Sequence, residues 1–174
     1  MSLQEQLCDS MLGNIVVIGI GNPSRGDDAA GSCLAQRIRA ARGLHVIDAQ
    51  DVPENHLGQA AELRPDTVLL IDSVDLHCAP GSVALLDRSQ TAGYWASTHR
   101  VPMSLLMDYL EQTTHAQIFL LAIQPAQTDF LQAMSDEVVS SIEAIADLLN
   151  EIFAERMMPA GAESAHATNY EARA

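Results

Sequence analysis

The chain has no lysine, and its only basic residues other than histidine are nine arginines, which face 23 acidic residues and leave a net charge of −14. Because nucleic-acid binding depends on neutralising phosphates, this balance argues against a nucleic acid partner, and it argues equally against an anionic membrane surface. The missing lysine also excludes a Schiff-base lysine and the lysine of a phosphate-binding P-loop.

Several targeting and metal-binding signals are missing as well. No apolar run reaches the roughly 18 residues that a membrane-spanning helix needs. The segment Met1–Gly13 contains acidic but no basic residues, so it does not resemble a secretory signal. Cys8, Cys33 and Cys78 form no CxxC pair, which argues against a zinc knuckle or a disulfide framework. We therefore expect a cytoplasmic protein.

The length of 174 residues and a hydrophobic content of 48% are sufficient for one domain with a real core. Apolar periodicity predicts strands at 14–20, 44–48, 67–72, 82–87 and 117–123, alternating with helices at 27–42, 54–63, 102–112 and 135–153. This alternation predicts an α/β three-layer sandwich: a twisted, mostly parallel five-stranded sheet with helices on both faces.

Strand 82–87 follows its predecessor after a short Pro80-Gly81 turn, so we expect one antiparallel strand. The predicted domain covers residues 1–153. Residues 154–174 have no apolar period and are expected to be disordered.

The segment that follows the first predicted strand is the most informative part of the chain. Its β-branched run stops at Gly19 and Gly21, a short polar loop follows, and Asp27 and Asp28 stand where a helix should begin. The glycines are typical of a phosphate-binding loop, because a helix N-terminus attracts anions. Two carboxylates at that position repel phosphate and favour a cation instead.

A second carboxylate and an imidazole complete a candidate cation site. Asp72 ends the third predicted strand, and His99 lies in a loop after the fourth strand, just ahead of a helix. In an open α/β sheet, sites form beyond the carboxyl ends of the strands, so Asp28, Asp72 and His99 are expected to converge there. Two carboxylates and one imidazole suit a borderline divalent ion such as nickel, zinc or iron.

Each of these residues also has a structural interpretation when taken alone. Asp27 or Asp28 can cap or begin a helix, Asp72 can accept hydrogen bonds from a loop, and His99 can be a surface histidine. Asp51 and Glu54, which follow the second strand, are interpreted as helix caps.

In combination, the motifs resemble those of the hydrogenase maturation endopeptidases. The resemblance extends over about residues 14–153 and rests on the following segments in order: Gly19-Ile20-Gly21-Asn22, Gly26-Asp27-Asp28-Ala29-Ala30-Gly31, Leu70-Ile71-Asp72, Pro80-Gly81, Thr98-His99 and Ile123-Gln124-Pro125. Val52-Pro53-Glu54-Asn55 further resembles the branch that serves the hydrogenase of formate hydrogenlyase.

The resemblance implies a cytoplasmic, nickel-dependent endopeptidase. Such enzymes remove a C-terminal peptide from the precursor of a [NiFe] hydrogenase large subunit after nickel has been inserted, and the nickel in the precursor is the recognition signal. The metal-contacting and catalytic residues of the family correspond to Asp28, Asp72 and His99. The nickel is expected to arrive with the substrate, other divalent ions can replace it in the isolated protein, and the chain is expected to be a monomer.

One segment departs from the family pattern, and two other functions remain open. Many members have Asp-Gly-Gly where this chain has Asp48-Ala49-Gln50, which predicts a loop less able to adopt positive φ. A peptidyl-tRNA hydrolase shares the Gly19–Pro23 opening, but the net charge of −14 and the Asp27-Asp28 pair disfavour it. A non-catalytic nickel or hydrogenase assembly factor would bind the precursor without cutting it.

Overall fold

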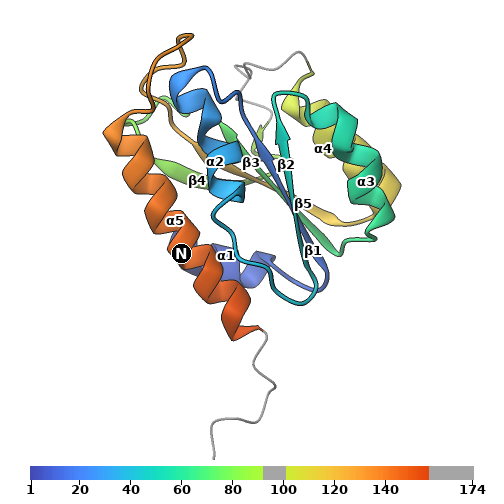
Figure 1. Ribbon diagram of the computed structural model, residues 1–174. Helices are drawn as coiled ribbons and strands as arrows, with labels where there is room; N and C mark the ends of the chain where they lie inside the picture. The colour runs from blue at the N-terminus through green and yellow to red at the C-terminus, as the bar shows by residue number, and fades with distance from the viewer. Residues whose placement is uncertain (92–100, 157–174) are drawn as a thin grey trace, which may run out of the picture.

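The structure, a computed structural model, describes residues 1–91 and 101–156 and contains one five-stranded sheet (Figure 1). The strands are β1 (Ile15–Ile20), β2 (Leu44–Gln50), β3 (Thr67–Ser73), β4 (Val83–Asp87) and β5 (Gln117–Ile123). Their order in the sheet is β2-β1-β3-β5-β4, with β4 antiparallel to β5 and the other neighbours parallel. The predicted α/β class, with its mostly parallel sheet and one antiparallel strand, is confirmed.

Helices cover both faces of this sheet. They are α1 (Leu3–Ser10), α2 (Ala30–Ala35), α3 (Leu57–Glu62), α4 (Met103–Thr114) and α5 (Asp136–Glu155), with short 3₁₀ helices η1 (Gly26–Ala29) and η2 (Pro53–His56). The helices α1, α2 and α5 pack against one face, and α3 and α4 pack against the other (Figure 1). The predicted three-layer arrangement is therefore correct.

The central strands contribute side chains to two separate apolar cores. In β1, Val16 and Ile18 belong to the core under α3 and α4, whereas Ile15 and Val17 belong to the core under α1, α2 and α5. Every residue of β1 and β3 is buried. A parallel strand that is covered on both faces reads as an unbroken apolar run, which is why these strands are evident in the sequence.

The predicted helix at 27–42 is wrong in its second half, because α2 ends at Ala35. The connection that follows is bound to α5: the backbone N–H of Arg39 donates to Asn150 Oδ1 (2.8 Å), and Asn150 Nδ2 donates to the carbonyl of Arg37 (3.1 Å). Ile38 and Ala41 still pack against the core on this side. The apolar spacing of Ile38 and Ala41 is therefore typical of a helix, although hydrogen bonds with the Asn150 side chain hold this segment in a non-helical connection.

The first helix, α1, has no counterpart among the predicted elements. Ser2 and Glu5 form a reciprocal capping box, in which Glu5 N–H donates to Ser2 Oγ (3.2 Å) and Ser2 N–H donates to Glu5 Oε2 (2.6 Å). Leu7 and Met11 are fully buried against the sheet. The helix therefore closes the core near the amino ends of the strands.

The last helix, α5, begins one residue after Ser135, as the sequence predicts, and continues to Glu155. Residues 154 and 155 thus extend the helix beyond the predicted domain end at 153. The expectation of disorder for the remaining tail concerns residues that, from 157 on, lie outside the described part of the chain. Within residues 1–91 and 101–156, none of the helices combines the length and apolar character required to cross a membrane.

Candidate functional site

Glycines bring the Asp27-Asp28 turn close to the carboxyl ends of the central strands. A Cβ atom at Gly31, in α2, would lie 2.1 Å from the carbonyl oxygen of Ile71 in β3 and 2.3 Å from that of Ile20 in β1. At Gly21, where φ is 152°, a Cβ would lie 2.1 Å from the carbonyl oxygen of Asp28. Only glycine fits such close approaches of backbone to backbone, so the motif glycines place η1 directly against the sheet edge.

Asp28 and Asp72 are both buried at this edge. Asp28 is 1% exposed and Asp72 is 0% exposed, and they belong to η1 and to the end of β3, which contact each other. The backbone N–H of Ser73 donates to Asp72 Oδ1 (2.8 Å). Buried carboxylates are costly unless hydrogen bonds, a proton or a cation compensate them. Two buried carboxylates on η1 and β3, which contact each other, form an arrangement that suits a cation.

His99, the third predicted site residue, lies outside the described residues. Among residues 1–91 and 101–156 no group of three or more histidine, cysteine, aspartate or glutamate side chains is positioned to hold a metal ion. The site of Asp28, Asp72 and His99 therefore stays a prediction as a three-residue set.

Asp27 lies in the first turn of η1, where it does not cap a helix but binds a segment that is distant in the sequence. It is 0% exposed, and neither η1 nor α2 has a side-chain cap. Its Oδ2 accepts from the backbone N–H groups of Ala126 (2.7 Å) and Gln127 (3.1 Å) and from Ser135 Oγ (2.9 Å), while its Oδ1 accepts from the Ser135 N–H (2.7 Å). Asp27 thus holds the connection between β5 and α5 against η1.

Ser135 is one of the hydrogen-bond partners of Asp27. It occupies the N-cap position of α5, but its side chain does not cap the helix and donates to Asp27 instead. The sequence carries no local signal for this pairing, since the partners are 108 residues apart.

Two acidic residues, Asp48 within β2 and Asp51 directly after it, bind other groups of the protein. Asp48 accepts from Ser32 Oγ (2.7 Å) and Gln36 Nε2 (2.8 Å), which connects β2 to α2 and the residue after it. Asp51 Oδ2 accepts from Asn22 Nδ2 (3.2 Å). Neither η2 nor α3 has a side-chain cap, so the interpretation of Asp51 and Glu54 as helix caps is wrong.

The absence of glycine at positions 49 and 50, the last two residues of β2, does not prevent a left-handed backbone there. Gln50 has φ of 50° despite its side chain. Its carbonyl accepts from the Gly21 N–H (2.7 Å), and its own N–H donates to Asp48 Oδ1 (3.3 Å). These two bonds compensate the strain that a glycine would avoid, so the loop keeps contact with the first motif.

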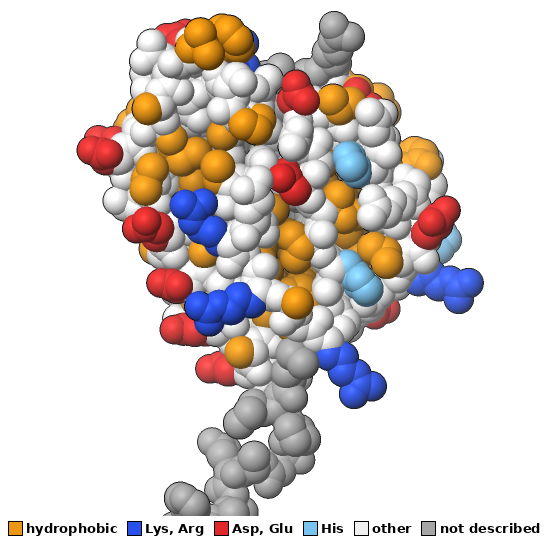
Figure 2. Space-filling view, viewed as in Figure 1, with side chains coloured by type: hydrophobic (Ala, Val, Ile, Leu, Met, Phe, Trp, Pro, Cys, Tyr) orange, Lys and Arg blue, Asp and Glu red, His pale blue; other side chains and the backbone are white. Residues whose placement is uncertain are grey.

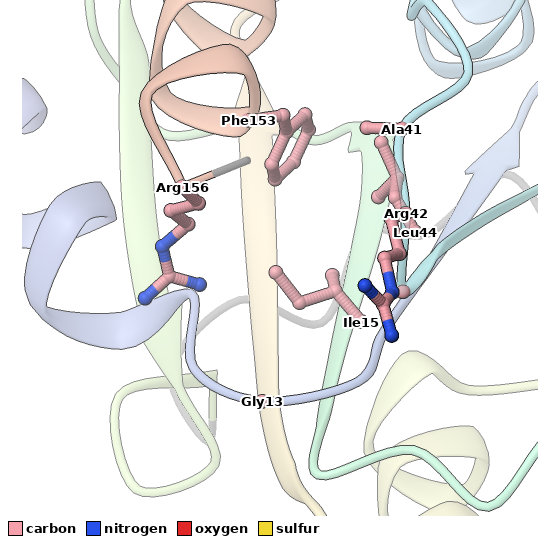
Figure 3. Close-up of a pocket in the computed structure, with 8 residues that line it drawn as sticks. Gly13, Ile15, Ala41, Arg42, Leu44, Phe153 and Arg156 are labelled. Carbon is pink, nitrogen blue, oxygen red and sulfur yellow. The ribbon is translucent and has the colours of Figure 1, made fainter. Parts of the chain in front are cut away.

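A pocket of about 320 Å³ lies at the opposite edge of the sheet (Figure 3). Ile15 and Leu44, the first residues of β1 and β2, contribute apolar lining together with Phe153, and the side chains of Arg42 and Arg156 also border the pocket. Because it adjoins the amino ends of the strands, this pocket is separate from the candidate site around Asp28 and Asp72.

Comparison with known proteins agrees with the family resemblance of the sequence motifs. The family model described as hydrogenase maturation protease matches residues 30–152. The chain is 33% identical over 133 residues to the hydrogenase 3 maturation protease of Escherichia coli K12, covering 75% of this chain and 85% of that protein. It is 30% identical to the crystal structure of a [NiFe] hydrogenase maturation protease from Thermococcus kodakarensis, with a TM-score of 0.79, covering 86% of this chain and 99% of the other.

A protein of Methanocaldococcus jannaschii that is provisionally named a hydrogenase maturation protease is 30% identical over 165 residues, which cover 88% of this chain and 97% of that protein. The type of relative agrees with the expected formate hydrogenlyase branch. These similarities favour a hydrogenase maturation protease over the alternative of a peptidyl-tRNA hydrolase. The chain therefore belongs to the hydrogenase maturation protease family, and it is a peptidase.

Proposed function

We propose that this protein removes a C-terminal peptide from the nickel-loaded precursor of a [NiFe] hydrogenase large subunit, and that Asp28, Asp72 and His99 contact the nickel that the precursor carries. Family membership supports the reaction class. The observation that carries the site is that Asp28 and Asp72 are both buried and belong to η1 and β3, two elements that contact each other.

The path of α4 supports the inclusion of His99. This helix ends at Thr114, and β5 begins only a few residues later at Gln117, which pairs with the first residue of β3. A helix of 12 residues is about 18 Å long, so its first residue, Met103, lies toward the carboxyl edge. His99 precedes Met103 by four residues in the sequence.

The donor set is chemically appropriate for nickel. Carboxylate and imidazole ligands suit a borderline divalent ion, and no thiolate is needed. Peptide hydrolysis also requires a base for the attacking water, and Asp28 and Asp72 are carboxylates at the same edge. The nickel of the precursor fixes the position of the scissile bond, and the protein supplies the base.

The proposal is tested by mass spectrometry of purified nickel-loaded precursor after incubation with wild type, Asp28→Asn, Asp72→Asn or His99→Ala. Each variant is expected to lower the cleavage rate by at least about 100-fold. Asp75→Asn is the matched control, because Asp75 follows β3 closely but is only partly buried and accepts a hydrogen bond from the N–H of His77. It is expected to stay within about twofold of wild type.

Full activity of the three site variants would overturn the assignment of the site. Wild type that binds the precursor in a metal-dependent way but leaves its mass unchanged would favour the non-catalytic assembly factor.

A further inference from the structure

Two adjacent apolar side chains protrude from the connection between β5 and α5. Phe130 is 63% exposed and Leu131 is 78% exposed. This connection forms the orange loop at the top of Figure 1, and a group of hydrophobic side chains covers the same corner of the molecule in Figure 2. Exposed single apolar residues are common on protein surfaces, but a phenylalanine beside a leucine at a projecting loop tip gains nothing from the core.

The backbone at this tip is also unfavourable for its side chain. Leu131 has φ of 62°, in the left-handed region that favours glycine. The N–H of Leu131 donates to the carbonyl of Ser24 (2.7 Å), which holds the tip against the loop that precedes η1. The exposed side chain of Leu131 adds no core contact at this strained position, and backbone strain of this kind clusters at functional sites.

The tip is fixed relative to the candidate site. Asp27 accepts hydrogen bonds from Ala126, Gln127 and Ser135, at the two bases of the loop. Gln127 Nε2 also donates to the carbonyl of Ala133 (3.0 Å) and closes the loop below its tip. Asp27 is the direct neighbour of Asp28 in η1. A contact made by the tip is therefore held at a set position from the carboxylate that we propose to act in cleavage.

We propose that Phe130 and Leu131 form a docking tip that binds an apolar surface of the folded large-subunit precursor and thereby positions its cleavage segment at Asp28 and Asp72. The identity of the partner rests on the proposed function. A protein surface is the fitting partner because the tip projects instead of enclosing a pocket, and buried aromatic and aliphatic anchors dominate protein interfaces.

The test measures binding of the purified nickel-loaded precursor to immobilised full-length protein by interferometry. Phe130→Ser/Leu131→Ser is expected to weaken affinity by at least about tenfold, because both anchors lose their apolar area. The matched control is Leu105→Ser/Tyr109→Ser, which changes two exposed apolar residues of α4 (57% and 45% exposed). The control is expected to stay within about twofold of wild type. Unchanged binding by the tip variant, or an equal loss in the control, overturns the proposal.

Leu131→Gly separates binding from folding. Glycine relieves the left-handed strain, so this variant is expected to be at least as stable as wild type in urea denaturation. It is nevertheless expected to bind the precursor at least about fivefold more weakly, because the leucine anchor is gone. A Leu131→Gly variant that binds as tightly as wild type would contradict the docking role of that residue.

Cleavage kinetics distinguish this proposal from the function on which it rests. If wild type cleaves the precursor, the tip variants are expected to raise KM while kcat stays within about twofold. Wild-type cleavage with unchanged KM in the variants overturns the tip and leaves the function standing. If wild type binds but does not cleave, the proposed function fails, and the binding comparison still decides the role of the tip. If wild type does not bind, the tip is overturned as well.

Discussion

At the scale of single residues, Asp27 and Asp28 show how far sequence reasoning reaches. The motif and its charge predict that a carboxylate of this pair lies at the sheet edge, and both are buried there. Their different roles have no local signal, because the hydrogen-bond partners of Asp27 are 99 to 108 residues away. Periodicity and turn chemistry report only on near neighbours, so a contact that depends on the closed fold stays hidden.

Asp27→Asn is expected to lower the free energy of unfolding by about 2–4 kcal/mol, measured by urea denaturation. The amide replaces one accepting oxygen with a donor, which faces an N–H or O–H donor of the loop. Ser135→Ala removes only the side-chain bond and is expected to cost about 1 kcal/mol. A variant Asp27→Asn with wild-type stability but without cleavage would instead identify Asp27 as a catalytic residue.

At the scale of elements, the sequence predicts the strands that are buried on both faces of the sheet. The strands β1, β3 and β5 read as apolar runs because helices cover both sides of the sheet. The early end of α2 could not be predicted, since Ile38 and Ala41 keep an apolar spacing while the backbone follows side-chain bonds to α5. The helix α1 shows its S-x-x-E capping signal, but its few apolar residues give only a short periodic segment.

The ion pair of Arg88 and Asp108, which connects the end of β4 to α4, predicts that stability depends on pH. Arg88 follows the end of β4, and its Nη2 donates to Asp108 Oδ2 in α4 (3.0 Å). The hydrogen bond from Arg88 lowers the pKa of Asp108 below its ordinary value of 3.8. A lowered pKa in the folded state contributes stability above the ordinary pKa, and this contribution is lost as the pH falls through the folded value.

Asp108→Asn is therefore expected to lower the melting temperature by about 1–3 °C at pH 7. The difference from wild type should shrink as the pH falls through the lowered folded-state pKa of Asp108 and disappear at a pH below it, where the wild-type carboxyl is also uncharged. Calorimetry across this range checks the prediction, and Arg88→Gln should have an effect that does not add to that of Asp108→Asn. A difference that stays constant down to low pH would show that the ion pair is not its cause.

At the scale of the whole molecule, the net charge of −14 is unevenly distributed. The helix α5 carries six exposed acidic residues and no basic residue in its last turn. Four of them, Glu143, Asp147, Glu151 and Glu155, follow one another at a spacing of four residues, which places them on one helix face. Figure 2 shows the resulting line of acidic side chains along the left margin, where α5 runs in Figure 1. Like charges at this spacing destabilise a helix, so repulsion along this face lowers the stability of the folded protein.

Higher ionic strength is accordingly expected to stabilise the protein, because salt screens exposed charges. The melting temperature should rise by a few degrees, about 2–5 °C, between 20 mM and 500 mM sodium chloride. Glu151→Lys turns its contacts with Asp147 and Glu155 into attractive pairs, so this variant should melt about 2–4 °C higher at low salt and respond less to added salt. Glu62→Lys, on α3 and away from the acidic row, is the control for net charge alone. If both substitutions raise the melting temperature equally, the acidic row on α5 is not the cause, and the effect comes from the net charge of the molecule.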